Sequence, residues 1–492
     1  MAALITTGVF LLFFRRLSWV LPEPPPRSLL LCAALFTLLV IPVSHIAGID
    51  TYKWQDLAGS VAVEERIAWF IHPLSLFGFT PRSYSSAQPL TLASIQMLGH
   101  TGVDWGFYIL SVACGLMGLA GAWLLGRDLF SSDRQATWFA FLYVFAPVFM
   151  RYNYWATGRG FLLALLPLYL LVALKLLAPP PPLAPLQRLA HIPAFLLLSL
   201  LLGLSHKAGI IAIVLIPLVF IVSPALALLR GRGLLLLAFI IALGTGLIIS
   251  GEGPLGLGWR LITRFAWLLP LAVVGLYRQK GKVSPAARVM LAGGFATLVL
   301  SCTPEMYGAL VALPFVTFMA AMGISAFSPD QPLPLGHRTW EPALAALTIL
   351  AAFTIVINQS TDSPNESVYR AARFLEQYDP KGPYRIEAPG KARAQIQAYV
   401  SGCPRFSVNT SGEMPLEIQR PPEWTGHPAQ DARHWIGYLR KALYLRGTGT
   451  DWYGAGNKVY TVTINSEGTA PPGTTLLFTH ENVRVYGPRV SN

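Results

Sequence analysis

The chain has 492 residues, of which 53% are hydrophobic and only 12% are charged. Soluble globular proteins carry about 25% charged residues, so this composition excludes an ordinary soluble enzyme, a fibrous protein and a disordered chain. The net charge is +13, and most basic residues lie in short loops between apolar runs. That distribution indicates that the basic residues set the orientation of the chain in a membrane, and it predicts no nucleic-acid partner.

About eleven apolar segments are candidates for membrane spans. A hydrocarbon core of about 30 Å is crossed by roughly 20 residues of α-helix. Several segments are shorter than this, which predicts tilted or partial spans. The segments are 28–46, 104–125, 136–150, 160–178, 191–204, 208–225, 233–250, 259–277, 287–301, 306–326 and 340–357.

The loops between these segments predict the orientation of the chain. Alternate loops, including those with Arg15, Arg16 and Arg278, hold more Lys and Arg than the others, so the positive-inside rule puts them in the cytoplasm. With eleven spans the N-terminus is then inside and the C-terminus outside. We predict a multi-span membrane domain over 1–357, with a long first outer loop over 47–103, and an extracytoplasmic domain over 358–492.

The C-terminal segment differs in composition from the rest. It holds half of the 24 acidic residues, and helical and alternating patterns follow one another along it. We therefore expect a small α/β domain. Its predicted helices are 365–378, 391–401 and 430–446, and its predicted strands are Tyr384–Glu387, Lys458–Ile464, Thr475–Phe478 and Val483–Tyr486.

Two carboxylates, Asp50 and Asp56, open the long first loop just beyond the outer end of the first span. A carboxylate at a membrane boundary is costly to desolvate, so it faces water, a cation or a cavity. The alternative is a helix cap, with Asp50 standing before a solvated interfacial helix.

The string Gly48-Ile49-Asp50-Thr51-Tyr52 resembles the start of the first outer loop in the GT-C superfamily of membrane glycosyltransferases. Leu204-Ser205-His206-Lys207-Ala208-Gly209 is similar to a turn between middle helices of prokaryotic GT-C-like proteins. The topology as a whole resembles these families too. Where many members have a histidine four residues after the aspartate, this chain has Trp54.

The resemblance implies an enzyme in the plasma membrane of a prokaryote that uses a polyprenyl-phosphate-linked sugar donor and an extracytoplasmic glycan, lipid or protein acceptor. It makes Asp50 the catalytic base or a ligand of a divalent metal, Mg²⁺ or Mn²⁺. A carboxylate within hydrogen-bond reach of the acceptor can take its proton. Metal-dependent members supply a second acid from the next outer loop, where this chain has none. Asp56, Glu252 or Glu305 could substitute for it, unless all three are ordinary solvated loop residues.

Basic residues at the outer ends of spans, against the positive-inside trend, are candidates for phosphate binding. Arginine grips phosphate through two N–H groups, and lysine binds it as a point charge. Snorkelling to lipid headgroups is the alternative for such residues, and interfacial enrichment is the alternative for the aromatic ones. The substrate-binding candidates, with Glu305, are Arg151, Tyr154, Arg159, His206, Lys207, Arg260 and Arg264.

Two other classes of function stay open at this point. A transporter or flippase for a lipid-linked substrate usually shows repeated halves and charges near the middle of its spans, which this chain lacks. A non-catalytic subunit of a larger complex would tolerate Asp50→Ala, whereas a glycosyltransferase would not.

Overall fold

The computed structural model describes residues 26–40, 46, 49–64, 67, 76–78, 85–177, 191–224, 232–250, 253–278, 284–302, 307–325, 344–352, 354, 364–380, 384–401, 458–464 and 470–490. The chain divides into two compact units. The helical unit comprises residues 1–43 and 108–361, and the mixed unit comprises residues 44–107 and 362–492. Each unit is described by itself. The predicted helix at 430–446 and the candidate Glu305 lie outside the described residues.

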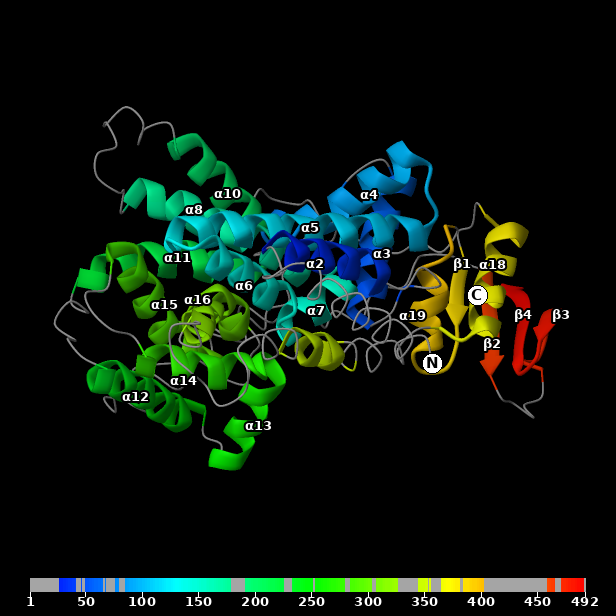
Figure 1. Ribbon diagram of the computed structural model, residues 1–492. Coiled ribbons are helices and arrows are strands. Elements are labelled where there is room, and N and C mark those ends of the chain that lie inside the picture. Colours follow the sequence, from blue (N-terminus) through cyan, green and yellow to red (C-terminus); the bar gives the residue numbers. More distant parts are fainter. Residues whose placement is uncertain are drawn as a thin grey trace, which may run out of the picture. The chain divides into compact units, whose positions relative to one another are not determined.

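The helical unit is a bundle of apolar helices (Figure 1). Residues 344–352 continue it as a further helical stretch near the end of the unit. The first residues of α5 belong to the mixed unit. The labelled helices are α2 (Pro26–Val40), α5 (Val103–Leu129), α6 (Asp133–Val144), α7 (Pro147–Tyr154), α8 (Gly158–Leu177), α10 (His191–Ser205), α11 (Lys207–Val222), α12 (Arg232–Ser250), α13 (Pro254–Phe265), α14 (Leu268–Arg278), α15 (Pro285–Ser301) and α16 (Tyr307–Ser325).

Three described helices are long and apolar enough to cross a membrane: Val103–Leu129, Gly158–Leu177 and Tyr307–Ile324. Shorter apolar helices include α10, α11 and α15. The segment predicted at 259–277 is not one straight helix, because α13 and α14 meet at an angle of 95°. Ala266 at the break has a φ of 42°, which a non-glycine residue rarely adopts and which ends α13. The pair is therefore a broken span or a re-entrant loop.

Helix α6 lies in the core of the helical unit and packs against α2 and α16. Every residue from Ala136 to Val144 is buried, as expected for a helix that is apolar on all sides. Trp138 meets Phe141 edge to face at 5.4 Å, and Phe141 lies 4.5 Å from Phe145 between ring centroids. Twelve residues of helix reach only about 18 Å, so α6 is too short to cross a bilayer core alone.

The mixed unit combines the predicted first loop with the C-terminal segment. Helices α3 (Ile49–Glu64) and α4 (Ala87–Gly99) come from the loop, and α18 (Glu366–Tyr378) and α19 (Ala392–Gln397) come from the tail. Helix α3 packs against both α4 and α19. The unit is thus built from two stretches far apart in the sequence.

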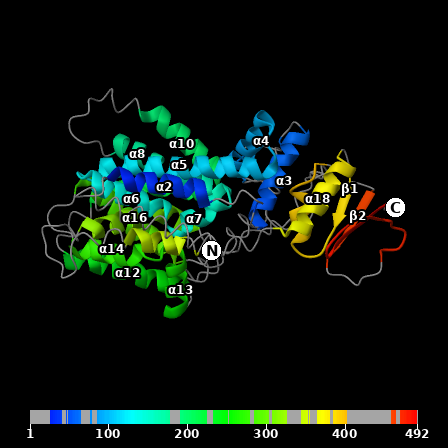
Figure 2. The same cartoon turned by 45° about the vertical axis from the view of Figure 1, so that its right-hand side comes forward.

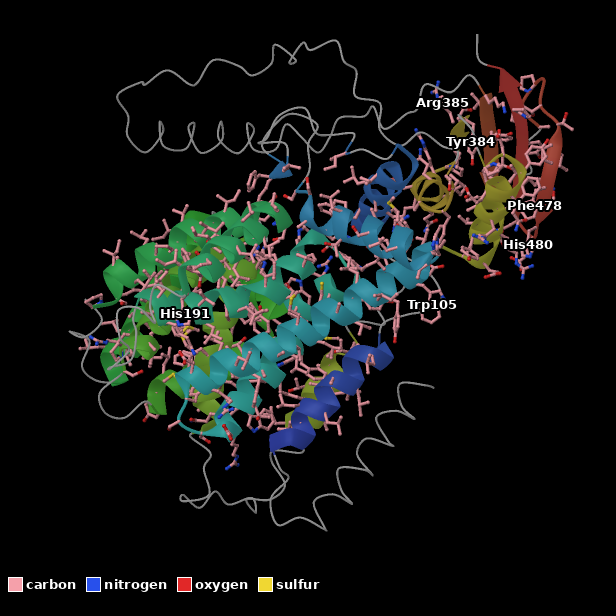
Figure 3. The ribbon with its side chains drawn as sticks, turned by 90° about the horizontal axis from the view of Figure 1, so that it is seen from above. Trp105, His191, Tyr384, Arg385, Phe478 and His480 are labelled. Carbon is pink, nitrogen blue, oxygen red and sulfur yellow. The ribbon has the colours of Figure 1, made fainter. Side chains whose placement is uncertain are left out.

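A four-stranded sheet completes the mixed unit, with α18 beside it (Figure 2). Its strands are β1 (Tyr384–Glu387), β2 (Lys458–Ile464), β3 (Leu476–His480) and β4 (Val483–Val490), in the order β1-β2-β4-β3. β1 and β2 are parallel, and the other pairs are antiparallel. On β3, Phe478 stacks on Phe374 of α18 at 4.9 Å, and Figure 3 shows Phe478 beside His480. Within the described residues, the predicted tail helices 365–378 and 391–401 and the predicted sheet are confirmed, with α19 shorter than expected.

Candidate functional site

The turn between α7 and α8 is tight and fully hydrogen-bonded to the end of α7. The N–H of Ala156 donates to the carbonyl of Asn153 at 2.9 Å, and the N–H of Thr157 donates to that of Tyr152 at 3.3 Å. Gly160 in the first turn of α8 lies against the backbone of α7, where a Cβ would overlap the carbonyl of Tyr152. This close approach fixes the start of α8 relative to the end of α7.

Two arginines lie over aromatic rings at this turn. The guanidinium of Arg151 is 4.7 Å from the ring centroid of Trp155, and that of Arg159 is 4.9 Å from the ring of Tyr152. Tyr152 and Trp155 are themselves 6.1 Å apart at 73°. Both rings therefore position cations, by cation–π attraction. Tyr154, the last residue of α7, is buried.

His206 lies in the turn between α10 and α11, next to Lys207. Its extended backbone makes it the N-cap of α11, and its Nδ1 accepts the N–H of Ala208 at 3.1 Å. The proton of the neutral ring is then on Nε2, which is a donor. The ring meets Tyr307, the first residue of α16, at 5.1 Å and 67°. The sequence motif around His206 thus forms a buried helix cap.

Burial lowers the pKa of His206 well below its usual value, and the positive charges of Arg159 and Lys207 lower it further. The imidazole is therefore neutral at physiological pH. The same electrostatic influence links the start of α8 to the start of α11, two helices that pack against each other. Three of the predicted phosphate-binding residues are thereby brought to one place.

Each of these two helices carries a cation where the helix dipole is already positive. Arg159 lies in the first turn of α8 and Lys207 begins α11, and neither of these described first turns contains an acidic residue. Acids are the favourable residues at helix N-termini, so each of these cations is unfavourable with respect to the dipole of its own helix. Converging N-termini and basic side chains form an anion-binding arrangement. We refer to Arg151, Arg159, His206 and Lys207 as the cation cluster.

Arg260 and Arg264 of α13 have a defined structural role. Arg260 Nη1 donates to the carbonyl of Cys302 at 2.8 Å, and Arg264 Nη1 donates to that of Ser301. Both carbonyls lie at the C-terminus of α15, whose dipole favours cations there. Arg264 is buried. These contacts fix α13 against α15, while α13 also packs against α7, the helix that carries Arg151.

The two predicted catalytic acids, Asp50 and Asp56, belong to the mixed unit. Asp50 is in the first turn of α3, with its side chain outside the described part of the chain, and Asp56 is buried in the middle of the same helix. The two positions are six residues apart, which puts them on different faces of an α-helix.

The described part of the chain contains no group of three His, Cys, Asp or Glu side chains that could hold a metal ion. Asp56 is the one predicted metal-site acid whose side chain is described, and it is buried in α3 without such a group around it. The described residues alone therefore do not provide a set of ligands for a divalent ion.

Sequence reasoning missed one polar cluster in the mixed unit. The hydroxyl of Tyr399 donates to Asp104 Oδ1 at 2.6 Å, across 295 positions of sequence. The only signal for it in the sequence was an acid in the first turn of a predicted span, which an ordinary helix start explains equally well.

Comparison with known proteins identifies the fold. No family model matches the chain, and no curated protein matches its sequence. Among solved structures, the apo oligosaccharyltransferase of Archaeoglobus fulgidus is similar with a TM-score of 0.56 and 14% identity, over 90% of this chain and 70% of that one. The same organism's enzyme AglB in complex with an inhibitory peptide and a dolichol-phosphate has a TM-score of 0.52 and 14% identity, over 89% and 69%.

ArnT from Cupriavidus metallidurans bound to undecaprenyl phosphate gives a TM-score of 0.56 at 12% identity, over 96% of this chain and 98% of that one. The similarity to ArnT thus extends over nearly the full length of both chains. At identities of 12–14%, the similarity shows a shared fold alone. The chain therefore has the fold of the archaeal oligosaccharyltransferase and of ArnT, in agreement with the GT-C resemblance noted in the sequence.

Proposed function

We propose that the chain is a membrane glycosyltransferase that moves a sugar from a polyprenyl phosphate or diphosphate to an extracytoplasmic acceptor. The acceptor is a glycan, a lipid or a protein. The proposal includes the topology of eleven spans with the N-terminus in the cytoplasm, and residues 358–492 outside the plasma membrane of a prokaryote. It also keeps residues 1–357 as the membrane domain.

The observation that carries the proposal is the cation cluster at the starts of α8 and α11. Three cations, two helix N-termini and a neutral donor suit a group with several anionic oxygens. A lipid phosphate fits this description. Solved structures of the same fold were determined with undecaprenyl phosphate in one case and dolichol-phosphate in another, which supports a carrier of that class here.

In the proposed reaction, each candidate residue has a defined role. An acceptor hydroxyl or amide attacks C1 of the sugar, the bond from C1 to the phosphate oxygen breaks, and the electron pair leaves with the lipid phosphate. Asp50 takes the acceptor proton, with Asp56 in support. The cation cluster stabilises the negative charge that develops on the leaving group. Arg260, Arg264, Tyr154 and Glu305 complete the proposed substrate contacts.

A divalent metal remains part of the proposal through Asp50 and Glu305. A metal would act as a Lewis acid on phosphate oxygens. One solved oligosaccharyltransferase of this fold is a complex with Zn and sulfate, which supports testing for metal dependence.

The test is turnover of purified protein with polyprenyl-phosphate sugars, followed by release of the lipid phosphate, with and without a chelator. Asp50→Asn and Arg159→Gln should each abolish or strongly reduce turnover. Arg127→Gln is the matched control. Arg127 is an exposed arginine that pairs with Asp133 at 3.3 Å and does not belong to the cation cluster. This variant should retain activity.

Each alternative has its own outcome. Carrier binding that survives Asp50→Asn, with no turnover by the wild type and movement of the carrier between leaflets, would favour a flippase. Absence of both binding and turnover with every carrier would favour a non-catalytic subunit and would overturn the proposal.

A further inference from the structure

Ile46 in the mixed unit has both of its backbone polar groups held by side chains. Its N–H lies 3.0 Å from Asp104 Oδ1 and 3.1 Å from the Tyr399 hydroxyl oxygen, so both accept from it. Its carbonyl accepts the Tyr52 hydroxyl at 3.2 Å. Gln395 in turn donates to the Tyr52 oxygen at 3.4 Å. The peptide groups around one residue are thus fixed from three directions.

These side chains come from three separate elements of the mixed unit. Asp104 is in the first turn of α5, Tyr52 is on α3, and Gln395 and Tyr399 are on or just after α19 in the tail. Ile46, Tyr52, Tyr399 and Gln395 are all buried. Water therefore competes weakly for these hydrogen bonds, and losing one partner leaves buried polar groups unpaired.

Tyr399 is the centre of this arrangement. Its hydroxyl donates to Asp104 at 2.6 Å, a short, charge-assisted hydrogen bond, and its oxygen accepts from Ile46. Burial raises the pKa of Tyr399, and the neighbouring charge of Asp104 raises it further. The phenol therefore remains protonated and keeps donating. Tyr369 of α18 packs edge to face on the ring at 5.1 Å and 87°, which fixes its orientation.

Ile46 precedes Asp50 by four residues, and Asp50 lies in the first turn of α3. We propose that Tyr399 and Asp104 are positioning residues, which fix the chain at the start of α3 and thereby the place of Asp50. This inference rests on the proposed function of Asp50 as the base. It gives the C-terminal segment a role in the reaction itself, in addition to any role in binding the acceptor.

The expected loss of kcat follows from how strongly proton transfer depends on the distance between the base and the proton. A general base works within hydrogen-bond reach of the proton, and a displacement of about 1 Å can cost roughly 100-fold in rate. The cation cluster belongs to the other unit and shares no residue with this network. Loosening the start of α3 should therefore lower kcat and leave the KM for the donor unchanged.

The test uses Tyr399→Phe in the full-length protein, since this variant removes one hydroxyl and keeps the ring that packs on Tyr369. The matched control is Tyr460→Phe. Tyr460 also donates to a carboxylate, Asp379, at 3.0 Å, but it connects β2 to the end of α18 and does not touch Ile46. A second variant, Asp104→Asn, keeps an oxygen acceptor and removes the charge.

Two measurements separate this inference from the proposed function. Amide hydrogen exchange over residues 46–57 should be about tenfold faster in Tyr399→Phe, which corresponds to about 1.4 kcal/mol of local opening, and unchanged in Tyr460→Phe. Steady-state kinetics should show kcat reduced about 10- to 100-fold with KM for the donor within about twofold of the wild type. Asp104→Asn should shift both in the same direction by less, and it carries the test if Tyr399→Phe does not fold.

Exchange no faster than in the Tyr460→Phe control would overturn the inference. Faster exchange with unchanged kcat would overturn it as well, because the network would then stabilise α3 without positioning the base. If the wild type shows no turnover at all, the proposed function fails and the positioning role fails with it, while the exchange data still report whether Tyr399 holds the start of α3.

Discussion

Replacing Lys207 by glutamine should have opposite effects on stability and on phosphate binding. In the absence of an anion, Lys207 adds positive charge to the N-terminus of α11, beside the buried His206 whose pKa it lowers. A charge of the unfavourable sign at a helix end costs about 0.3–1 kcal/mol. Lys207→Gln should therefore stabilise the ligand-free protein by up to about 1 kcal/mol.

The same substitution should weaken the binding of a polyprenyl phosphate. A hydrogen bond to a charged group contributes about 1.5–3 kcal/mol, so the Kd should rise roughly 10- to 150-fold. The assay is thermal unfolding of the solubilised protein with and without undecaprenyl phosphate, together with a binding titration at fixed salt. The wild type should gain more stability from the ligand than the variant does.

Lys175→Gln provides the matched control. Lys175 lies in the last turn of α8, where the dipole favours a cation, and it pairs with Asp128 at 3.6 Å. Its removal should slightly destabilise the protein and leave the affinity unchanged. A ligand-free Lys207→Gln that is less stable than the wild type, or that binds the phosphate equally well, would refute the interpretation of this turn as an anion site.

Three further substitutions test other parts of the structure. The pKa of His206 is lower in the folded than in the unfolded chain, so the unfolded chain binds more protons below about pH 6.5. The free energy of unfolding should therefore fall by about 1.4 kcal/mol per pH unit below that value. His206→Asn should flatten the dependence of the unfolding midpoint on pH. Gly160→Ala should cost about 1–3 kcal/mol and reduce phosphate binding, because its Cβ overlaps the Tyr152 carbonyl, whereas Gly258→Ala in the open part of α13 should be neutral or stabilising in the same unfolding assay. Asn365→Ala should cost about 1 kcal/mol in chemical unfolding of the mixed unit, since Asn365 Oδ1 accepts the Val368 N–H at 2.9 Å as the N-cap of α18; an unchanged midpoint would contradict this.

The local patterns of the tail predicted its elements because each pattern is contained within a few residues. The alternation in Lys458–Ile464 predicts a strand with the bounds that β2 has, and the apolar spacing of 365–378 predicts α18 to within one residue. The order β1-β2-β4-β3 was beyond such reasoning. Pairing Tyr384 with Lys458 depends on how residues far apart in sequence pack, which no short pattern encodes.

Hydropathy likewise predicted apolar segments but not their direction. The run over 259–277 is apolar throughout, yet the chain turns by 95° within it. Two features that accompany the turn are visible only in three dimensions: Arg260 and Arg264 on α13 donate to the end of α15, and Ala266 at the break has a positive φ. A sum of transfer free energies along the sequence contains no information on such contacts.

The candidate site divides in the same way. The positive charges near the predicted outer ends of the spans indicated Arg151, Arg159 and Lys207 as candidates, because basic residues there oppose the positive-inside rule. What the sequence did not reveal is that the rings of Tyr152 and Trp155 hold guanidinium groups. It also gave no reason to join Asp104 to Tyr399.

A cation in the first turn of a helix is by itself a modest cost, and many proteins tolerate it. Arg159 and Lys207 differ because both charges lower the pKa of one buried imidazole, which indicates that both act on the same place. Binding of a phosphate would offset both positive charges and add charge-assisted hydrogen bonds. By the same reasoning, the anion should stabilise the wild type more than any variant that lacks one of these charges, which makes stability a direct reporter of the proposed site.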